Sequence, residues 1–148
     1  MQRHATLPIP LFDAFSWFDS GLQALLREAG WTAVTRPQTM VLIAVGQGIS
    51  RPAEIARALS ITRQSAGSTI AEMVSEGLLQ LDPDPGDARA KIARLSAAGE
   101  ARRQDSRKAM RALTAELERR IGPDRVKMLE AALDRDWGPP VSSGEELT

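Results

Sequence analysis

The sequence contains no cysteine and only one histidine, His4. A chain without cysteine forms no disulfide bond, no thiolate zinc site and no thiol-based redox sensor. One histidine cannot build a metal site alone. The sequence also offers no nucleophile with a base and an orienting group, and no phosphate-binding loop. We therefore expect no metal, no cofactor and no enzymatic activity.

An excess of charge of one sign is also lacking. The 19 Lys and Arg residues balance the 19 Asp and Glu residues, so the formal net charge is zero. The chain therefore has no global basic field of the kind that drives strong non-specific binding to nucleic acid. A local basic surface remains open, because basic residues cluster between positions 51 and 94. They are Arg51, Arg57, Arg63, Arg89, Lys91 and Arg94.

Long apolar runs are absent too. The charge-free stretch from Pro37 to Ser50 is too short to span a bilayer. Asp13 and Asp19 interrupt the apolar start of the chain, which a signal peptide does not allow. With 148 residues, of which 43% are hydrophobic, the chain has enough apolar material for one domain with a core. We expect a cytoplasmic protein.

The central segment, residues 50–96, predicts two short helices followed by a β-hairpin. Ser50 is placed to cap the first helix, and Pro52 suits its first turn. Thr62 is placed to cap a second helix, which runs to Ser75. This order of elements predicts a helix-turn-helix motif.

The second helix turns small polar side chains away from its apolar stripe. Gln64, Ser65 and Ser68 lie on this outer side. Glutamine and serine both donate and accept hydrogen bonds, so they suit close approach to base edges in the major groove of DNA. Gly67 fits the same idea, because a glycine inside a helix costs about 1 kcal/mol against alanine and indicates a packing or close-approach reason. The alternative is that these are ordinary solvated residues.

Turn-forming residues 82–87 separate two strand candidates, Leu78–Leu81 and Lys91–Leu95, and predict a hairpin with a charged tip. Arg89 projects from this tip, and Asp87 is close enough in sequence to hold its guanidinium group. A tip of this kind suits a narrow DNA groove or a phosphate. The alternative is a surface ion pair that contributes almost no stability.

Five segments together resemble the MarR family of winged helix-turn-helix regulators. They are Ser50-x-Pro52-x-Glu54-Ile55-Ala56, Thr62-Arg63-Gln64, Glu76-Gly77-Leu78-Leu79, Asp87-Ala88-Arg89 and Leu95-Ser96-Ala97-Ala98-Gly99. No single segment is specific, but their order and spacing are. The resemblance implies that helix 62–75 reads the major groove and that Arg89 enters the minor groove. The residues that we expect at the DNA are Arg51, Thr62, Arg63, Gln64, Ser65, Ser68, Asp87, Arg89 and Lys91.

Helices are predicted before this motif as well. The helix at residues 10–30 has apolar groups on two sides, and the second side carries Trp17 beside Gly21. A second subunit would supply the surface that this helix needs, and the alternative is a stray surface tryptophan. Thr35 and Gln38 have the spacing of a capping box and begin a short buried helix.

The expected fold is mostly α-helical with a small β-hairpin wing: a winged helix-turn-helix with N- and C-terminal dimerisation helices. The helices that follow the wing carry their own apolar stripe, whereas the last residues hold too little apolar content to fold. We expect one domain over residues 1–148, with dimerisation helices at 10–30 and 97–137, the winged helix-turn-helix at 35–96 and a flexible tail at 138–148.

These features predict a sequence-specific regulator of transcription, a repressor, that binds double-stranded DNA as a homodimer on a pseudo-palindromic operator. The resemblance also implies a small aromatic ligand that releases the DNA. Trp17, Trp31 and Met40 would contribute to its pocket, or would otherwise be plain core. The alternative function is a winged-helix protein-interaction module without specific DNA binding, which the neutral net charge favours.

Overall fold

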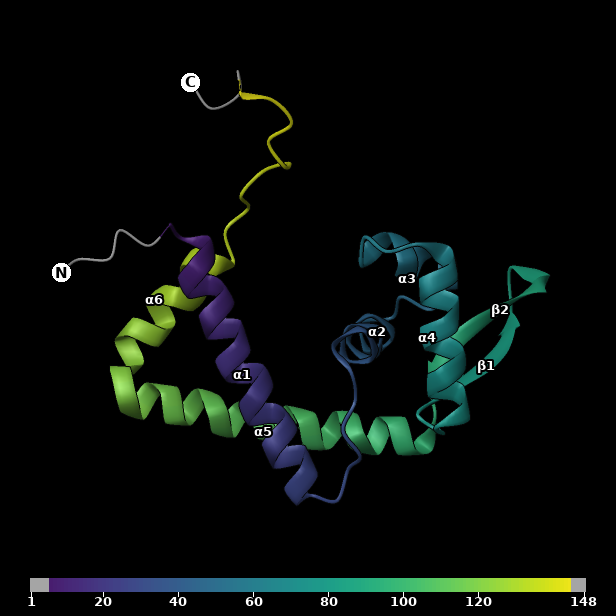
Figure 1. The fold of residues 1–148 in the computed structure, drawn as a ribbon, viewed down its shortest axis with the longest axis horizontal. Coiled ribbons are helices and arrows are strands. Elements are labelled where there is room, and N and C mark those ends of the chain that lie inside the picture. Colours follow the sequence, from purple (N-terminus) through teal and green to yellow (C-terminus); the bar gives the residue numbers. More distant parts are fainter. Residues whose placement is uncertain (1–5, 145–148) are drawn as a thin grey trace. The chain divides into compact units, whose positions relative to one another are not determined.

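The computed structural model of the chain describes residues 6–144 (Figure 1). His4 lies outside this range. Two compact units, Met1–Leu113 and Thr114–Thr148, divide the chain inside its fifth helix. The elements, in chain order, are α1 (Pro8–Glu28), α2 (Arg36–Gly46), α3 (Pro52–Ala58), α4 (Arg63–Ser75), β1 (Leu79–Asp84), β2 (Asp87–Leu95), α5 (Ala97–Ile121) and α6 (Pro123–Leu133).

This architecture, in which a two-stranded antiparallel hairpin follows two short helices, confirms the predicted fold class. The expectation of one domain over residues 1–148, with a tail at 138–148, stays a prediction. Within residues 6–144, no helix combines the length and the apolar character that crossing a membrane requires.

The helix starts follow from local capping, with one exception. Thr35 and Gln38 form the predicted capping box at α2, and Thr62 accepts a hydrogen bond from the backbone N–H of Ser65 at 3.1 Å. The prediction that Ser50 caps α3 is wrong, because the residue at the cap position is Arg51 and it makes no side-chain cap bond. The backbone carbonyl of Ser50 instead accepts the N–H of Ala93 at 2.7 Å and ties β2 to the start of α3.

The core of the winged helix-turn-helix lies where α2, α3, α4 and the hairpin meet. Val41, Ile55 and Met73 are its largest fully buried side chains, one from each helix. Leu79 and Ala93 close the core from the two strands. Because each element contributes only a narrow apolar stripe, the outer side of α4 is left to solvent.

The hairpin is longer than the sequence predicts. Leu79 pairs with Leu95 and the ladder continues to Pro83 opposite Lys91, so part of the expected turn segment is strand. The register then shifts, since Asp84 pairs with Asp87 and residues 88–90 stand outside the regular ladder. This irregularity forms the tip of the wing.

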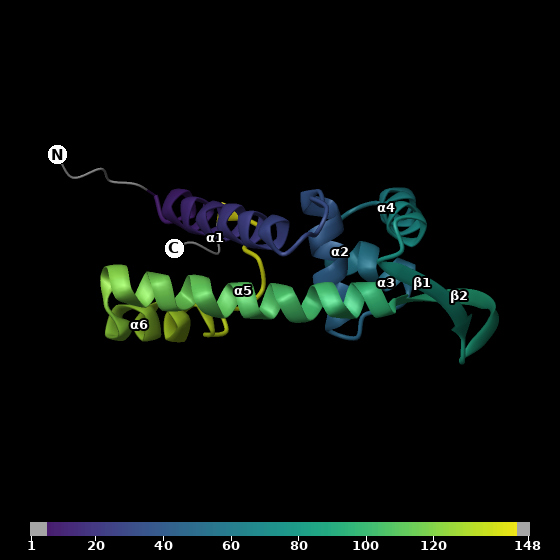
Figure 2. The ribbon, with the colours of Figure 1, turned by 90° about the horizontal axis from the view of Figure 1, so that it is seen from below.

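A second, smaller core joins α1 to the part of α5 that belongs to the same unit. Leu22 and Leu26 of α1 pack there with Ala109 and Leu113 of α5. A Cβ atom at Gly21 would lie 2.6 Å from Leu113 Cδ2, so the missing side chain lets α5 approach α1 where the two helices cross (Figures 1 and 2). At this glycine the covering surface therefore comes from the chain itself.

The junction between the wing and α5 is fixed by backbone proximity. Ser96 caps α5 as its position after the hairpin suggests, because its Oγ accepts the N–H of Gly99 at 3.0 Å and also donates to the carbonyl of Gly77. A Cβ atom at Gly99 would overlap the carbonyl oxygen of Leu78. Only glycine therefore fits at this point of α5.

The second unit holds the end of α5 and α6. Gly122 separates the two helices with a positive φ of 95°, and Pro123 begins α6. Hydrogen bonds from Arg119 and Arg120, of which the one from Arg119 has the larger effect, lower the pKa of Glu116 to about 2. These ion pairs are exposed, so we assign them little stabilising effect.

Candidate nucleic-acid interface

The outer side of α4 presents a row of small side chains. Gln64, Gly67, Ser68 and Ala71 are all exposed and recur at helical spacing, whereas Ala66, Ile70 and Met73 face the core. A helix with such a narrow outer surface can enter the major groove closely, where Gln64 offers a donor and an acceptor in one plane.

Gly67 lies on an open part of the surface of α4. Apart from the nearby backbone of α4 itself, no atom of the described residues lies within 4 Å of the position that a Cβ atom would take at Gly67, so no packing contact within residues 6–144 explains this glycine. The sequence offers one other reason for a glycine at this position, which is the close approach of α4 to DNA.

Two of the candidate side chains on α4 are already engaged with each other. The Oγ1 of Thr62 donates to the Oγ of Ser65 at 2.9 Å while it accepts the N–H of that same residue. This arrangement fixes the N-terminal turn of α4, from which Arg63 extends into solvent. All nine residues that the sequence places at the DNA are exposed.

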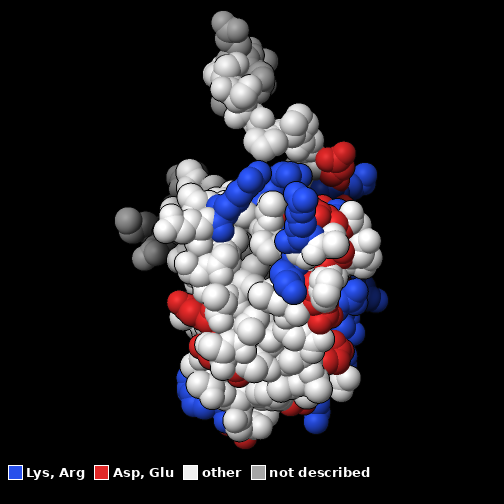
Figure 3. Space-filling view, turned by 90° about the vertical axis from the view of Figure 1, so that its right-hand side faces the viewer, with Lys and Arg blue, Asp and Glu red and all other residues white. Residues whose placement is uncertain are grey.

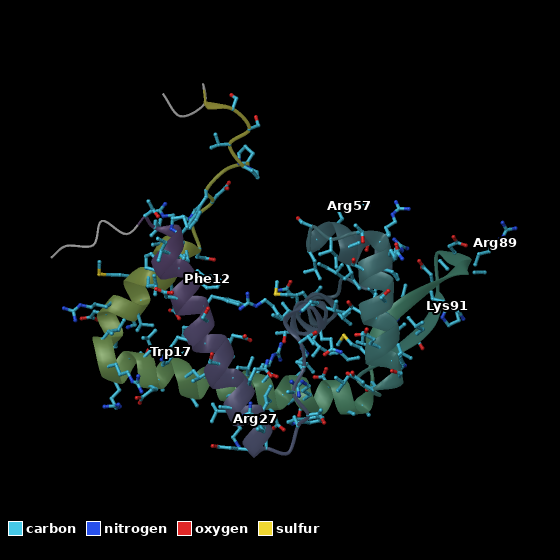
Figure 4. All side chains as sticks on the ribbon, in the orientation of Figure 1. Phe12, Trp17, Arg27, Arg57, Arg89 and Lys91 are labelled. Carbon is cyan, nitrogen blue, oxygen red and sulfur yellow. The ribbon has the colours of Figure 1, made fainter. Side chains whose placement is uncertain are left out.

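The wing tip differs in one detail from what the sequence predicts. Asp87 does not hold the guanidinium group of Arg89; its Oδ1 accepts the backbone N–H of Arg89 at 3.0 Å. The Asp87 carboxylate therefore shapes the turn rather than the charged side chain. Figure 4 shows Arg89 at the far end of the hairpin, where its side chain extends away from the rest of the unit, with Lys91 behind it on β2.

A different carboxylate, Asp84, binds a guanidinium group at the wing. Arg51 Nε donates to Asp84 Oδ2 at 2.7 Å and Arg51 NH2 donates to Oδ1 at 3.3 Å. The Arg51 hydrogen bond, followed by the bond from the N–H of Gly86, lowers the pKa of Asp84, and the carboxylate in turn raises the pKa of Arg51. Sequence reasoning missed this pair because its members lie 33 positions apart and the turn pattern gives Asp84 no distinguishing mark.

Basic side chains gather on the side of unit Met1–Leu113 that carries α3 and the wing. Arg57 on α3 and Arg89 on the hairpin both point outward there (Figure 4), and Figure 3 shows Lys and Arg side chains along the upper part of the same face. Several acidic groups nearby already have partners. Glu76 accepts the side-chain amide of Gln38, and Asp82 pairs with Arg94 at 3.1 Å. The neutral net charge of the chain therefore coexists with a local basic surface.

A cavity of about 580 Å³ lies in the same unit, between α1, α2 and α5. Its walls are mostly apolar, with side chains such as Leu22, Leu26, Leu42, Ile43 and Met110. The residues that the sequence suggests for a pocket, Trp17, Trp31 and Met40, are not among its lining. Trp17 packs edge-on against Phe18, and the indole N–H of Trp31 donates to Asp105 at 2.8 Å.

Polar groups of α1 and α5 also line this cavity. Arg102 is only 2% exposed; it donates to the carbonyl of Thr32 at 3.2 Å and lies over the ring of Trp31. Burial lowers the pKa of Arg102. The buried Oε1 of Gln23 has no hydrogen-bond partner within the part of the chain that the structure describes. Sequence reasoning missed Gln23 and Arg102, because their place beside the cavity depends on how α1, α2 and α5 pack together.

The N-terminal half of α1 exposes large apolar side chains. Ile9, Phe12 and Phe15 are 56%, 59% and 44% exposed. The guanidinium group of Arg36 lies over the rings of both phenylalanines, at 5.9 Å and 5.1 Å from their centroids. A run of exposed aromatic and aliphatic groups on one helix is typical of a protein–protein contact.

Comparison with known proteins gives consistent results. A sequence model described as the MarR family matches residues 34–90. The structure resembles the reduced form of MarR from E. coli, with a TM-score of 0.74 and 24% sequence identity over 89% of this chain and 96% of that chain. It also resembles RV1404 from Mycobacterium tuberculosis, with a TM-score of 0.70 and 18% identity over 90% and 93% of the two chains.

A third similar structure is the transcriptional regulator Tm0710 from Thermotoga maritima, with a TM-score of 0.62 and 18% identity over 86% of this chain and 90% of that chain. No curated protein sequence matches the chain. Tm0710 and another similar structure, PA4135, are both described as transcriptional regulators. Residues 34–90 of this chain are therefore similar in sequence to the MarR family, and the chain shares the fold of the MarR structures.

Proposed function

We propose that the chain is a sequence-specific regulator of transcription that binds double-stranded DNA. The observation that carries this proposal is the outer side of α4, where Gln64 is exposed beside the small residues Gly67 and Ser68, next to a wing that ends in Arg89. The amide of Gln64 suits the edge of an adenine, and a lone arginine on a narrow hairpin suits a minor groove. Arg63 and Lys91 supply positive charge for phosphates on either side.

The regulator acts as a homodimer on a pseudo-palindromic operator. Support comes from the exposed apolar side chains of α1, among them Phe12 and Phe15, which a second copy would cover. Two α4 helices related by a two-fold axis would read half-sites about one helical turn apart. We assign the chain the role of a repressor, since a dimer that occupies an operator blocks other proteins from the same DNA.

A small aromatic ligand in the cavity releases the DNA. The volume and apolar walls of the cavity fit a compound of this class. Gln23 and Arg102 support a polar or negatively charged substituent on it, because one has an unused acceptor and the other a buried positive charge without a carboxylate within ion-pair distance in residues 6–144. The cavity also touches α2, which packs against α4 in the core.

The test is selection of bound duplexes from a random pool, followed by titration of the selected site at two salt concentrations. The proposal expects a pseudo-palindromic consensus and an affinity that falls as salt rises. The second candidate function, a protein-interaction module, is favoured by the zero net charge. If the selection enriches no sequence and the protein binds the selected pool no more tightly than random duplex, the protein-interaction module replaces the DNA-binding regulator as the proposed function.

A further inference from the structure

Two side chains join the start of α3 to the wing at the point where the regular pairing of the hairpin ends. Arg51 contacts Asp84 through two nitrogens, at 2.7 Å and 3.3 Å, and its third nitrogen lies 3.5 Å from Glu54 on α3. A guanidinium group and a carboxylate that meet at two points fix their relative angle as well as their separation.

Asp84 is built into the wing rather than placed on its surface. Its side chain is 4% exposed, and its Oδ1 also accepts the backbone N–H of Gly86 at 2.9 Å. A Cβ atom at Gly86 would lie 3.2 Å from Arg51 NH2, so the turn runs close against the ion pair. One carboxylate therefore holds both the turn and the arginine.

A backbone contact lies next to the same junction. The carbonyl of Ser50, the residue before Arg51, accepts the N–H of Ala93 on β2 at 2.7 Å. The hairpin is thus attached to the start of α3 through β2 near its base and through Asp84 near its tip. Removing the attachment near the tip would leave the tip free to swing about the base.

We propose that Arg51 and Asp84 are positioning residues of the wing, which hold the hairpin at one angle to α3 and α4 so that Arg89 meets the DNA in a fixed direction. This inference rests on the proposed function, because it specifies how the DNA interface is built. Arg51 acts through Asp84 and not as a phosphate contact. Asp84 performs the role that the sequence pattern suggests for Asp87.

Positioning and simple electrostatics predict opposite signs for one substitution. Asp84→Asn removes a negative charge near the wing, so electrostatics alone would make DNA binding tighter. If the carboxylate positions the wing, the same change weakens binding, because the tip and the Arg89 side chain must then be ordered during binding. Ordering costs of this kind correspond to a loss of about three- to tenfold in affinity.

The experiment titrates the selected operator with Asp84→Asn, Arg51→Gln and the double variant at two salt concentrations. Each single variant should lose about three- to tenfold in affinity, and the double variant should lose no more than either one, since both break one contact. Arg51→Lys should behave like Arg51→Gln, because lysine cannot reproduce the two-point geometry. Asp82→Asn is the matched control: it makes the same charge change in the wing and removes only a surface ion pair with Arg94, so it should stay near wild type.

A second measurement needs no DNA. Amide hydrogen exchange in residues 84–92 should accelerate in Asp84→Asn and Arg51→Gln but not in Asp82→Asn, while exchange in α2 stays unchanged. If the wild-type protein bound no selected duplex, the proposed function would fail, and hydrogen exchange would still decide whether the pair holds the hairpin.

Three results would overturn the inference. They are tighter binding by Asp84→Asn, losses that add in the double variant, and a salt dependence that falls by about one phosphate contact in Arg51→Gln. Hydrogen exchange of the hairpin that is equal in all variants would overturn it as well.

Discussion

At the scale of single residues, two glycines show how the surroundings decide the role of one residue type. Gly99 stands where a side chain would overlap the backbone of Leu78, so the fold requires it. Gly67 stands in open space on the exposed side of α4, where glycine costs the helix about 1 kcal/mol against alanine. No contact within the described residues accounts for that cost, whereas the proposed approach of α4 to DNA would account for it.

Gly67→Ala should therefore stabilise the protein and weaken DNA binding. The free energy of unfolding should rise by about 0.4 to 1 kcal/mol, because alanine reduces the conformational freedom of the unfolded chain and its methyl group meets no described atom beyond the nearby backbone of α4. Affinity for the selected operator should fall, since the new methyl group stands where α4 approaches the bases. Urea unfolding and DNA titration of the same preparation measure the two effects.

Gly99→Ala is the control with the opposite sign. It should lower the free energy of unfolding, because α5 or the backbone of Leu78 must move to admit a methyl group. Equal stabilisation by both substitutions would show that Gly99 is under no packing constraint, and unchanged DNA binding by Gly67→Ala would remove close approach as its reason.

The ion pair of Asp84 makes stability depend on pH in a defined direction. Its pKa in the folded protein is lowered, first by the bond from Arg51 and then by that from Gly86. The stabilisation is thus fully present above the ordinary pKa of an aspartate, about 3.9, and is lost as the pH falls through the lower folded-state value. Wild type should unfold at higher urea concentration than Asp84→Asn at pH 7, and this difference should shrink below pH 4. A difference that stays constant down to pH 2 would assign the effect to packing.

At the scale of elements, the sequence predicts what local chemistry decides. The capping box of Thr35 and Gln38 and the cap at Thr62 act within one helical turn, so their spacing is visible in the sequence and the structure has both. The cap expected at Ser50 is not formed because Arg51 occupies the N-cap position of α3, and the carbonyl of Ser50 accepts a hydrogen bond from β2. Contacts that join distant segments, such as Arg51 with Asp84, leave no periodic mark.

The length of the hairpin shows the same limit. Asp82, Pro83 and Asp84 are turn residues by propensity, yet they lie in β1 because β2 pairs with them and Arg51 binds the last of them. Tertiary contacts therefore extend the strand beyond the point where local propensity would end it. The sequence predicts that the wing exists. It does not predict the contacts that attach the wing to α3.

Substitutions on α4 and on the wing should separate specificity from affinity. Gln64→Ala should change the base preferred at one position of each half-site, since a good bidentate contact gives about 1 to 3 kcal/mol of discrimination. Arg89→Ala should weaken binding to all duplexes more evenly, because a contact in the minor groove reads width more than sequence. Repeated selection from a random pool with each variant measures the preference. An unchanged consensus and affinity for Gln64→Ala would refute the assigned recognition surface.

At the scale of the whole molecule, the apolar side chains of α1 are exposed in a single copy of the chain, which is unfavourable for a protein that stays monomeric. Part of the second apolar side of this helix, at Gly21, is covered by α5 of the same chain, which the sequence could not indicate because it does not show which helices cross. Phe12 and Phe15 remain exposed in the first half of α1. The cavity was equally invisible to sequence reasoning, because its lining comes from three separate helices.

Light scattering should find the wild-type protein as a dimer and Phe12→Asp as a monomer with the same helix content. The charged side chain would be buried without a partner if a second copy covered this part of α1, and that cost opposes association. Leu81→Asp is the matched control, because Leu81 is 43% exposed on β1 and should leave the dimer intact. A monomeric wild type would leave the pseudo-palindromic operator without a physical basis.

A ligand in the cavity between α1, α2 and α5 and DNA bound to α4 must change each other's affinity by the same factor. One of its walls, α2, packs on α4 and contacts its end through Gln38 and Glu76, so an occupant that favours one position of α2 bears on the helix proposed to read DNA. A compound that loosens the hold on the operator by some factor must itself be held less tightly, by the same factor, once the operator is bound. Calorimetric titrations of such a compound into the free protein and into the protein–operator complex would then give a coupling free energy. Titrations of the operator into the protein with and without the compound should give the same value.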